Sequence, residues 1–243
     1  MERPRAPRRK SVLPNEAVER PDRKQAILLA AERLFAQHGY HGVSIRQIAD
    51  EAGVPLALVG YYYGQKQELF HAIFEHWSHT IHERLELLAQ ARTQPRDGKS
   101  LERVVRAFVE PVMRMRASPE GEYYALLVAR ELAYRTPEAD LVLSDYFDPM
   151  AHAFIDALQE ACPGSDRAQI AWAYQFALGA LIHHMSDQRV ERLSQGANQP
   201  CDPAALPQLV AFVTAGIAAV AGTAGKTSPD PSIKPSSHRR RPA

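Results

Sequence analysis

The chain has 243 residues, of which 45% are hydrophobic and 23% charged, and it has only two cysteines, Cys162 and Cys201. This length is ample for a buried core, and two isolated cysteines exclude a disulfide framework and a Cys-x-x-Cys metal site, which favours a reducing cytoplasm. The net charge of +1 hides an asymmetry, because residues 11–223 carry −7 between two basic ends, so this acidic part can meet a polyanion only through a local surface.

Both ends of the chain are rich in Pro, Ser and Arg. This composition predicts a disordered basic arm over 1–20 and a disordered basic tail over 224–243. The start, MERPRAPRRK, is basic but no apolar segment follows it, so we expect no signal peptide. Between the ends the apolar residues recur with helical period and we find no convincing alternating strand, which predicts an all-α fold.

Three short helices are predicted first. In the first, over 22–38, an apolar stripe is formed by Ile27, Ala31, Leu34 and Phe35. Gly39 ends this helix. Ser44 and Gln47 form a capping box at the start of the second helix, which stops at Gly53. Pro55 suits the first turn of the third helix, where a missing N–H costs nothing.

The second and third helices have the spacing of a helix-turn-helix. Ala49 is small where the two helices would cross, Gly53 can take positive φ in the turn, and Val59 would hold the third helix on the second. An ordinary corner between two helices has the same packing needs. This pattern alone therefore leaves both interpretations open.

Longer helices are predicted over the rest of the chain. A continuous helix over about 65–91 has one apolar face, and residues 93–100 form a loop that we expect to separate two domains. Pro111 and Pro149 should kink or split two of the later helices. Those later helices are predicted at about 101–116, 122–135, 138–161, 166–192 and 203–221.

Three consecutive tyrosines close the segment AGVPLALVGYYYGQK, residues 52–66. Neighbouring side chains on a helix point about 100° apart. Tyr61, Tyr62 and Tyr63 therefore cannot all face one core, and at least one ring must meet something outside its own domain.

The segment from Ala30 to Phe70 resembles the tetracycline-repressor (TetR) family of bacterial transcription regulators. The similar features are Ala-x-x-Leu-Phe with Gly-Tyr, then Ile-Ala with Ala-Gly-Val, then Tyr-x-Gly-x-Lys-x-x-Leu. The resemblance implies an all-α homodimer. Its N-terminal three-helix helix-turn-helix DNA-binding domain would cover 21–70, and its C-terminal helical ligand-binding and dimerisation domain 71–223.

The resemblance also implies a set of DNA contacts. Ser44 and Arg46 fall where family members touch phosphate and a base edge, whereas Tyr63 matches a core aromatic. Gly60 departs from the family, which commonly has Tyr there. The implied DNA-binding residues are Ser44, Arg46, Gln47, Pro55, Leu56, Ala57, Leu58, Gly60, Tyr61, Tyr62 and Lys66. Residues 21–70 carry five basic and five acidic residues, so arm 1–10 either adds attraction to DNA or is a solubilising segment.

A small, largely apolar effector is expected in the second domain, because Met and aromatic side chains adapt to variable ligands. The same side chains also suit an ordinary core. The candidate effector contacts are Phe108, Met113, Tyr123, Tyr124, Leu127, Arg130, Trp172, Phe176 and His183.

A homodimer is expected from the helices at about 166–192 and 203–221, because both have more apolar surface than one buried face uses. A two-fold partner would cover the excess. The candidate interface residues are Ala173, Ala177, Ala180, Leu181, His184, Phe212, Val213, Ala215 and Ala219.

Other classes of protein stay open as alternatives. We find no catalytic or nucleotide-binding motif, so we expect no enzyme and no cofactor, and the alternative is a helical adaptor or enzyme with an incidental helix corner. His76, His79 and His82 are a candidate metal stripe, but a solvated histidine face is preferred and no metal is expected. Residues 204–222 approach the length of a membrane span, yet Pro207 and Gln208 favour a buried helix. We therefore predict a cytoplasmic, ligand-responsive repressor that binds double-stranded DNA and no membrane.

Overall fold

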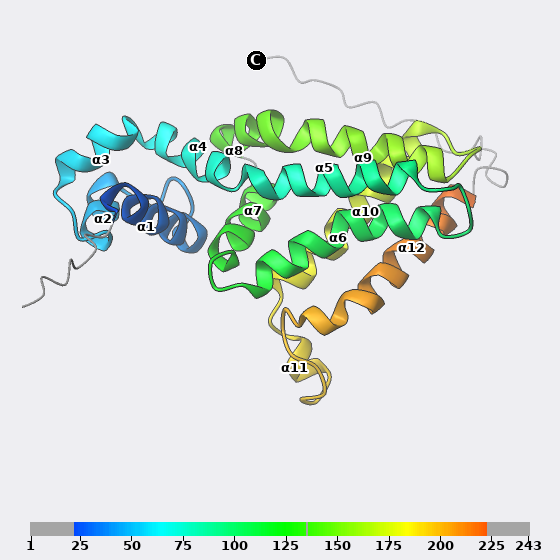
Figure 1. Cartoon of the computed structure of the whole chain (residues 1–243). Coiled ribbons are helices and arrows are strands. Elements are labelled where there is room, and N and C mark those ends of the chain that lie inside the picture. Colours follow the sequence, from blue (N-terminus) through cyan, green and yellow to red (C-terminus); the bar gives the residue numbers. More distant parts are fainter. Residues whose placement is uncertain (1–21, 135, 223–243) are drawn as a thin grey trace, which may run out of the picture.

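The computed structural model describes residues 22–134 and 136–222, which are helical with short connections and contain no strand. The predicted arm 1–20 and tail 224–243 lie outside these described residues. At one end of the elongated molecule a small group of helices forms a head (Figure 1). It consists of α1 Arg23–His38, α2 Ile45–Glu51, α3 Leu56–Tyr63 and α4 Lys66–His76.

The ends of the head helices follow from local chemistry that the sequence predicted. Ser44 caps α2 and forms the predicted capping box with Gln47. Gly39, which ends α1, and Gly53, in the turn between α2 and α3, both have positive φ, 75° and 64°, which only glycine adopts without strain. Pro55 directly precedes α3 as its N-cap rather than lying in its first turn.

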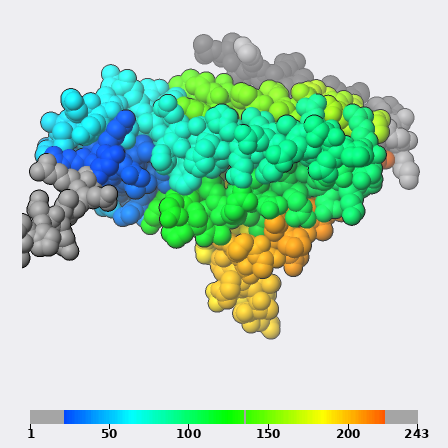
Figure 2. All heavy atoms as spheres, viewed as in Figure 1, coloured from blue at the N-terminus to red at the C-terminus, as the bar shows by residue number. Residues whose placement is uncertain are grey.

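The remaining helices form an elongated body, with α5, α6 and α9 running along its length (Figure 1). A 3-10 turn, η2 (Pro203–Ala205), precedes the last helix, and a π-helical turn, η1 (Leu143–Phe147), joins α8 to α9. The body helices are α5 Ser78–Thr93, α6 Ser100–Ala117, α7 Glu122–Tyr134, α8 Pro137–Val142, α9 Asp148–Ala161, α10 Arg167–Ser186, α11 Val190–Leu193 and α12 Leu206–Gly222. The short α11 projects from the body (Figure 2).

Four predicted helices differ from the observed ones. The helix expected over 166–192 ends at Ser186, and residues 190–193 form the separate helix α11. The helix expected over 65–91 breaks at Trp77, whose φ of −91° and ψ of 4° leave α-helical geometry and start a new helix at Ser78. The segment 138–161 divides at η1, after which Pro149 lies in the first turn of α9. Pro111, expected to kink or split its helix, lies inside one continuous α6 and is buried.

Two hydrophobic cores meet near Trp77, whereas the sequence predicted a domain boundary at the loop 93–100. Trp77 belongs to the head core and Ile81 to the body core. The loop 94–99 only turns the chain between α5 and α6, which pack against each other. Tyr124 and Leu127 of α7 also contribute to the head core, so the head is completed by a helix of the body.

The last helix, α12, was expected to be buried, but only one of its faces is. Val210, Val213 and Ile217 pack into the body core, whereas Phe212 is 70% exposed. Residues Pro203–Gly222 are long and apolar enough to cross a membrane by length and composition alone, and 17% of that window is buried in the chain. An uncovered apolar face therefore lies along α12.

Candidate functional site

The helix α3 lies at the end of the head away from the body (Figure 1). Val59 is fully buried against α2, where Ala49 is also buried, as the helix-turn-helix spacing predicts. On the same helix Tyr61 is 79% exposed and Tyr62 is 36% exposed. Tyr63 is half-buried and donates its hydroxyl to the carbonyl of Lys24 at 2.9 Å. The three tyrosines thus divide as expected, with two rings outward and one inward.

Most of the other predicted DNA-binding residues are exposed. Leu56, Ala57, Arg46 and Pro55 are exposed, and Leu58 is half-buried. Around Gly60, also exposed, a Cβ would meet no atom within 4 Å. The side chains of Ser44 and Gln47 are exposed but bond each other's backbone N–H groups in the capping box.

Lys66, the last predicted DNA-binding residue, is half-buried at the start of α4. Its Nζ lies 4.3 Å from the centre of the Tyr40 ring, and partial burial lowers the pKa of its ammonium. The charge is thus partly satisfied by the face of an aromatic ring.

Buried side chains connect α1 of the head to α7 of the body at the break between α4 and α5. The indole Nε1 of Trp77 donates to Oε2 of Glu32 at 2.7 Å, and the indole ring stacks on Tyr124 with 5.1 Å between ring centres and 10° between planes. Glu32 is only 2% exposed. Burial raises the pKa of this carboxyl to about 7, opposed by the hydrogen bond from Trp77.

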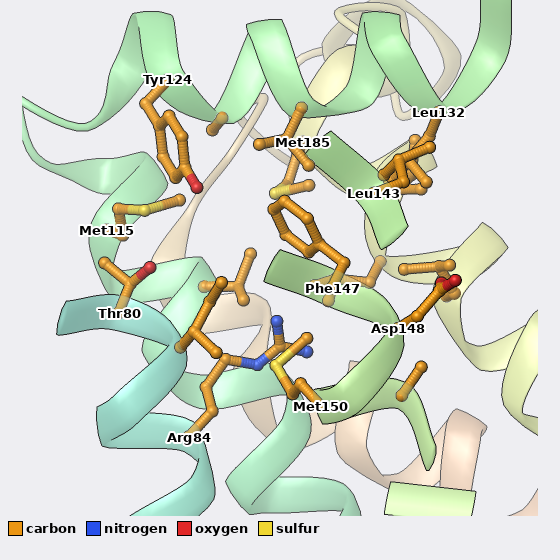
Figure 3. Close-up of a pocket in the computed structure, with 18 of the residues that line it drawn as sticks. Thr80, Arg84, Met115, Tyr124, Leu132, Leu143, Phe147, Asp148, Met150 and Met185 are labelled. Atoms are coloured by element: carbon orange, nitrogen blue, oxygen red, sulfur yellow. The ribbon is translucent and has the colours of Figure 1, made fainter. Parts of the chain in front are cut away.

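A cavity of about 190 Å³ lies in the body directly beyond Tyr124. Its wall is largely apolar and comes from α5, α6, α7, η1, α9 and α10 (Figure 3). Its lining includes Thr80, Arg84, Met115, Tyr124, Phe147 and Met150. Of the nine predicted effector contacts, Tyr124 alone lines this cavity.

The other eight predicted effector contacts lie elsewhere, for reasons of helical phase. Phe108 and Met113 are buried in the body core, and Leu127 in the head core. Tyr123 and Arg130 face other partners, since the Arg33 guanidinium lies 5.4 Å from the Tyr123 ring and that of Arg130 lies 5.0 Å from the Tyr134 ring. Trp172, Phe176 and His183 lie on the exposed side of α10.

Sequence reasoning missed Arg84, although a signal was present. Arg84 lies three residues after Ile81 and four before Leu88, both buried, and it therefore occupies the apolar stripe of its helix. A charged residue on such a stripe is rarely buried without a partner. The Arg84 side chain is 6% exposed.

The outer faces of α10 and α12 lie side by side and carry most of the predicted interface residues. Phe212, Ala215 and Ala219 are exposed and Ala180 and His184 half-buried. Ala173, Ala177 and Val213 are buried in the chain's own core and form the floor of a shallow groove of about 130 Å³. The structure corrects the prediction of Leu181 as an interface residue, because its side chain is buried and lines the cavity.

Trp172 and Phe176, predicted as effector contacts, stack on each other at 5.8 Å on the outer face of α10. They are 62% and 59% exposed. Together with Phe212 they form an exposed aromatic patch, which we call the α10–α12 face.

The predicted histidine stripe does not gather metal ligands in the described part of the chain. His79 Nδ1 lies 3.1 Å from the carbonyl oxygen of His76. Within residues 22–134 and 136–222 no group of three or more His, Cys, Asp or Glu side chains could hold a metal ion.

The fold and the site define a class of all-α proteins in which a helix-turn-helix head is joined to a helical body with a cavity. Residues 27–73 match the family model for bacterial regulatory proteins of the tetR family, and residues 106–216 match that for the tetracyclin repressor-like C-terminal domain. The chain belongs to the TetR family.

Individual relatives match over the head or over the fold. The transcriptional regulator RutR of Escherichia coli is 43% identical over 51 residues, 21% of this chain and 24% of RutR. The chain thus spans about a quarter of the length of such curated relatives. The fatty acid degradation regulator FadR of Bacillus halodurans has a TM-score of 0.58 at 17% identity, covering 80% of this chain and 96% of that one. FadR of Bacillus subtilis, solved with stearoyl-CoA, has a TM-score of 0.56 at 16% identity, covering 79% and 98%. These two structures share the fold with this chain.

Proposed function

We propose that the protein is a cytoplasmic, ligand-responsive transcription regulator without enzymatic activity, which represses by binding a pseudo-palindromic DNA operator as a homodimer. The observation that carries the proposal is the outer face of α3, where Leu56, Ala57 and Tyr61 are exposed while Val59 fixes the helix on α2. Apolar side chains there suit thymine methyl groups in a major groove. Arg46 would read a base edge, and Tyr61, Tyr62 and Lys66 would contact phosphates.

A footprint on the DNA flanking the protein's own gene tests this assignment. We expect protection of two half-sites whose centres lie one helical turn apart, or a multiple of it. Arg46→Ala should weaken specific binding about 5- to 150-fold, because a base contact is worth about 1–3 kcal/mol. Arg92→Ala, which removes an equal charge at the far end of α5, serves as control. Absence of protection, or equal effects of the two substitutions, contradicts the assignment.

The homodimer would form through the α10–α12 face. Trp172, Phe176 and Phe212 leave apolar surface exposed, and the adjacent Ala215, Gly216 and Ala219 let a second helix approach closely. A two-fold contact would place each helix against its own copy or its neighbour. It would also orient two heads toward one palindromic site.

Effector binding would reach the head through Tyr124. This residue lines the cavity on one side and stacks on Trp77 on the other, and Trp77 binds Glu32 of α1. A ligand that shifts Tyr124 would therefore shift the junction of α4 with α5 and the angle of the head. Such a ligand must bind the DNA-free conformation more tightly, since equal affinity for both states changes nothing.

A further inference from the structure

Arg84 is a buried cation without a counter-ion. Its Nε and Nη2 atoms are buried and have no hydrogen-bond partner, and no carboxylate of the described residues lies within ion-pairing distance of it. The guanidinium lies over two aromatic rings, at 4.6 Å from the centre of Phe108 and 5.6 Å from that of Phe154. Burial lowers the pKa of Arg84 to about 10, so the group keeps its charge at neutral pH.

Such an arrangement is costly in a protein interior. Taking a charge out of water is strongly unfavourable unless it is paired and hydrogen-bonded, and contacts with aromatic rings offset only part of this desolvation. Arg116 of the same body shows the usual solution. It is similarly buried, at 8% exposed, but its Nε donates to the carbonyl of Met185 at 3.1 Å and it pairs with Glu122 at 3.4 Å.

A second unpartnered polar group lies on the same cavity wall. The hydroxyl of Tyr124 is buried without a hydrogen-bond partner, and Figure 3 shows it pointing into the space that Arg84 also borders. The single carboxylate of the lining, Asp148, is exposed and lies away from the guanidinium (Figure 3). A cation donor and a hydroxyl donor thus face a largely apolar cavity.

We propose that the effector is a small monocarboxylate whose acid group binds Arg84 and the Tyr124 hydroxyl while its apolar body fills the cavity. This inference rests on the proposed function and gives its effector a chemical class. The carboxylate would supply the missing counter-charge and accept from the orphaned N–H groups. Since a cavity of about 150 Å³ holds benzene, about 190 Å³ suits a body the size of a phenyl ring or slightly larger.

The proposal predicts how the ligand-free protein responds to losing this charge. Arg84→Met should melt at the same temperature as the wild type or higher, because it removes an unpaired buried charge and keeps the apolar contacts. Arg116→Met is the matched control and should melt at a lower temperature, since it leaves buried partners unsatisfied. A structural arginine at 84 would make both variants less stable, and that result overturns the proposal.

Binding of defined probes tests the ligand class directly. Benzoate, phenylacetate and hexanoate are compared with their primary amides by calorimetry on the full chain without DNA. We expect the acids to bind at least 10-fold more tightly than the amides. Arg84→Met should remove this preference, and Tyr124→Phe should weaken acid binding about 10- to 150-fold, as expected for one lost hydrogen bond to a charged group.

Two outcomes contradict the carboxylate assignment. One is a preference for the amides, or equal binding of acids and amides, in the wild type. The other is no binding of any of the three acids at millimolar concentration. These binding measurements contain no DNA. A negative result would therefore contradict the carboxylate site without bearing on operator binding. A missing footprint would contradict operator binding without bearing on the carboxylate site.

Discussion

Protonation of Glu32 should make the stability of the folded chain depend on pH. The pKa of this buried carboxyl is raised from 4.5 to about 7. Between these values the folded protein holds a proton that the unfolded chain releases, so the free energy of unfolding falls as pH rises from about 4.5 to about 7. A difference of this size corresponds to about 3 kcal/mol.

Glu32→Gln removes the titration while keeping an oxygen that accepts the Trp77 indole N–H. Urea unfolding of the wild type and this variant at pH 5, 6, 7 and 8 measures the effect. The wild type should lose about 2.5 kcal/mol relative to Glu32→Gln between pH 5 and 8, because part of the change falls below pH 5. Glu86→Gln, an exposed carboxyl on α5, should follow the wild type. Parallel curves for Glu32→Gln and the wild type would show that Glu32 titrates normally and refute the reasoning.

Two further substitutions test the head and the α10–α12 face. Gly60→Ala should raise the free energy of unfolding by about 0.5–1 kcal/mol in urea titration, because Gly60 is helical and a Cβ meets nothing there; a loss of stability contradicts the open space around it. Ala215→Glu should yield folded monomers in analytical ultracentrifugation, since it places an unpaired charge on the proposed interface; dimers that persist rule out this face as the interface.

Much of the head could be predicted from the sequence because its determinants are local. The capping box of Ser44 with Gln47 and the positive φ of Gly53 each depend on residues within a few positions. The buried pair Ala49 and Val59 depends on helical phase over a similar span. Such short-range features also make a family resemblance visible.

The cavity could not be predicted to the same extent, because its wall comes from six separate helical elements. Whether an aromatic residue of α10 faces a core, a ligand or a partner depends on the rotation of the helix about its axis. The sequence places apolar residues on both sides of α10, so periodicity does not fix this rotation. Trp172 and Ala177 show the consequence, since the large residue is outside and the small one inside. Arg84 was overlooked because only its neighbours on other helices reveal that it lacks a partner.

The break at Trp77 was missed because the apolar stripe continues through it. Leu69, Ile73 and Ile81 keep helical spacing across the break. What ends α4 is tertiary, since the indole is held by Glu32 and by Tyr124, which lie far away in the sequence. Periodicity reports which residues are apolar and cannot report such a change in backbone direction.

The sharing of α7 between the two cores has a consequence for how the chain melts. Tyr124 and Leu127 complete the interior of the head, while Ala125, between them in sequence, belongs to the body. A head cut out after His76 would lack part of its own interior, so head and body should unfold as one cooperative unit. A ligand that binds in the cavity and raises the melting temperature of the body should then raise that of the head by the same amount. A single melting curve would therefore measure ligand binding for the whole cooperative unit.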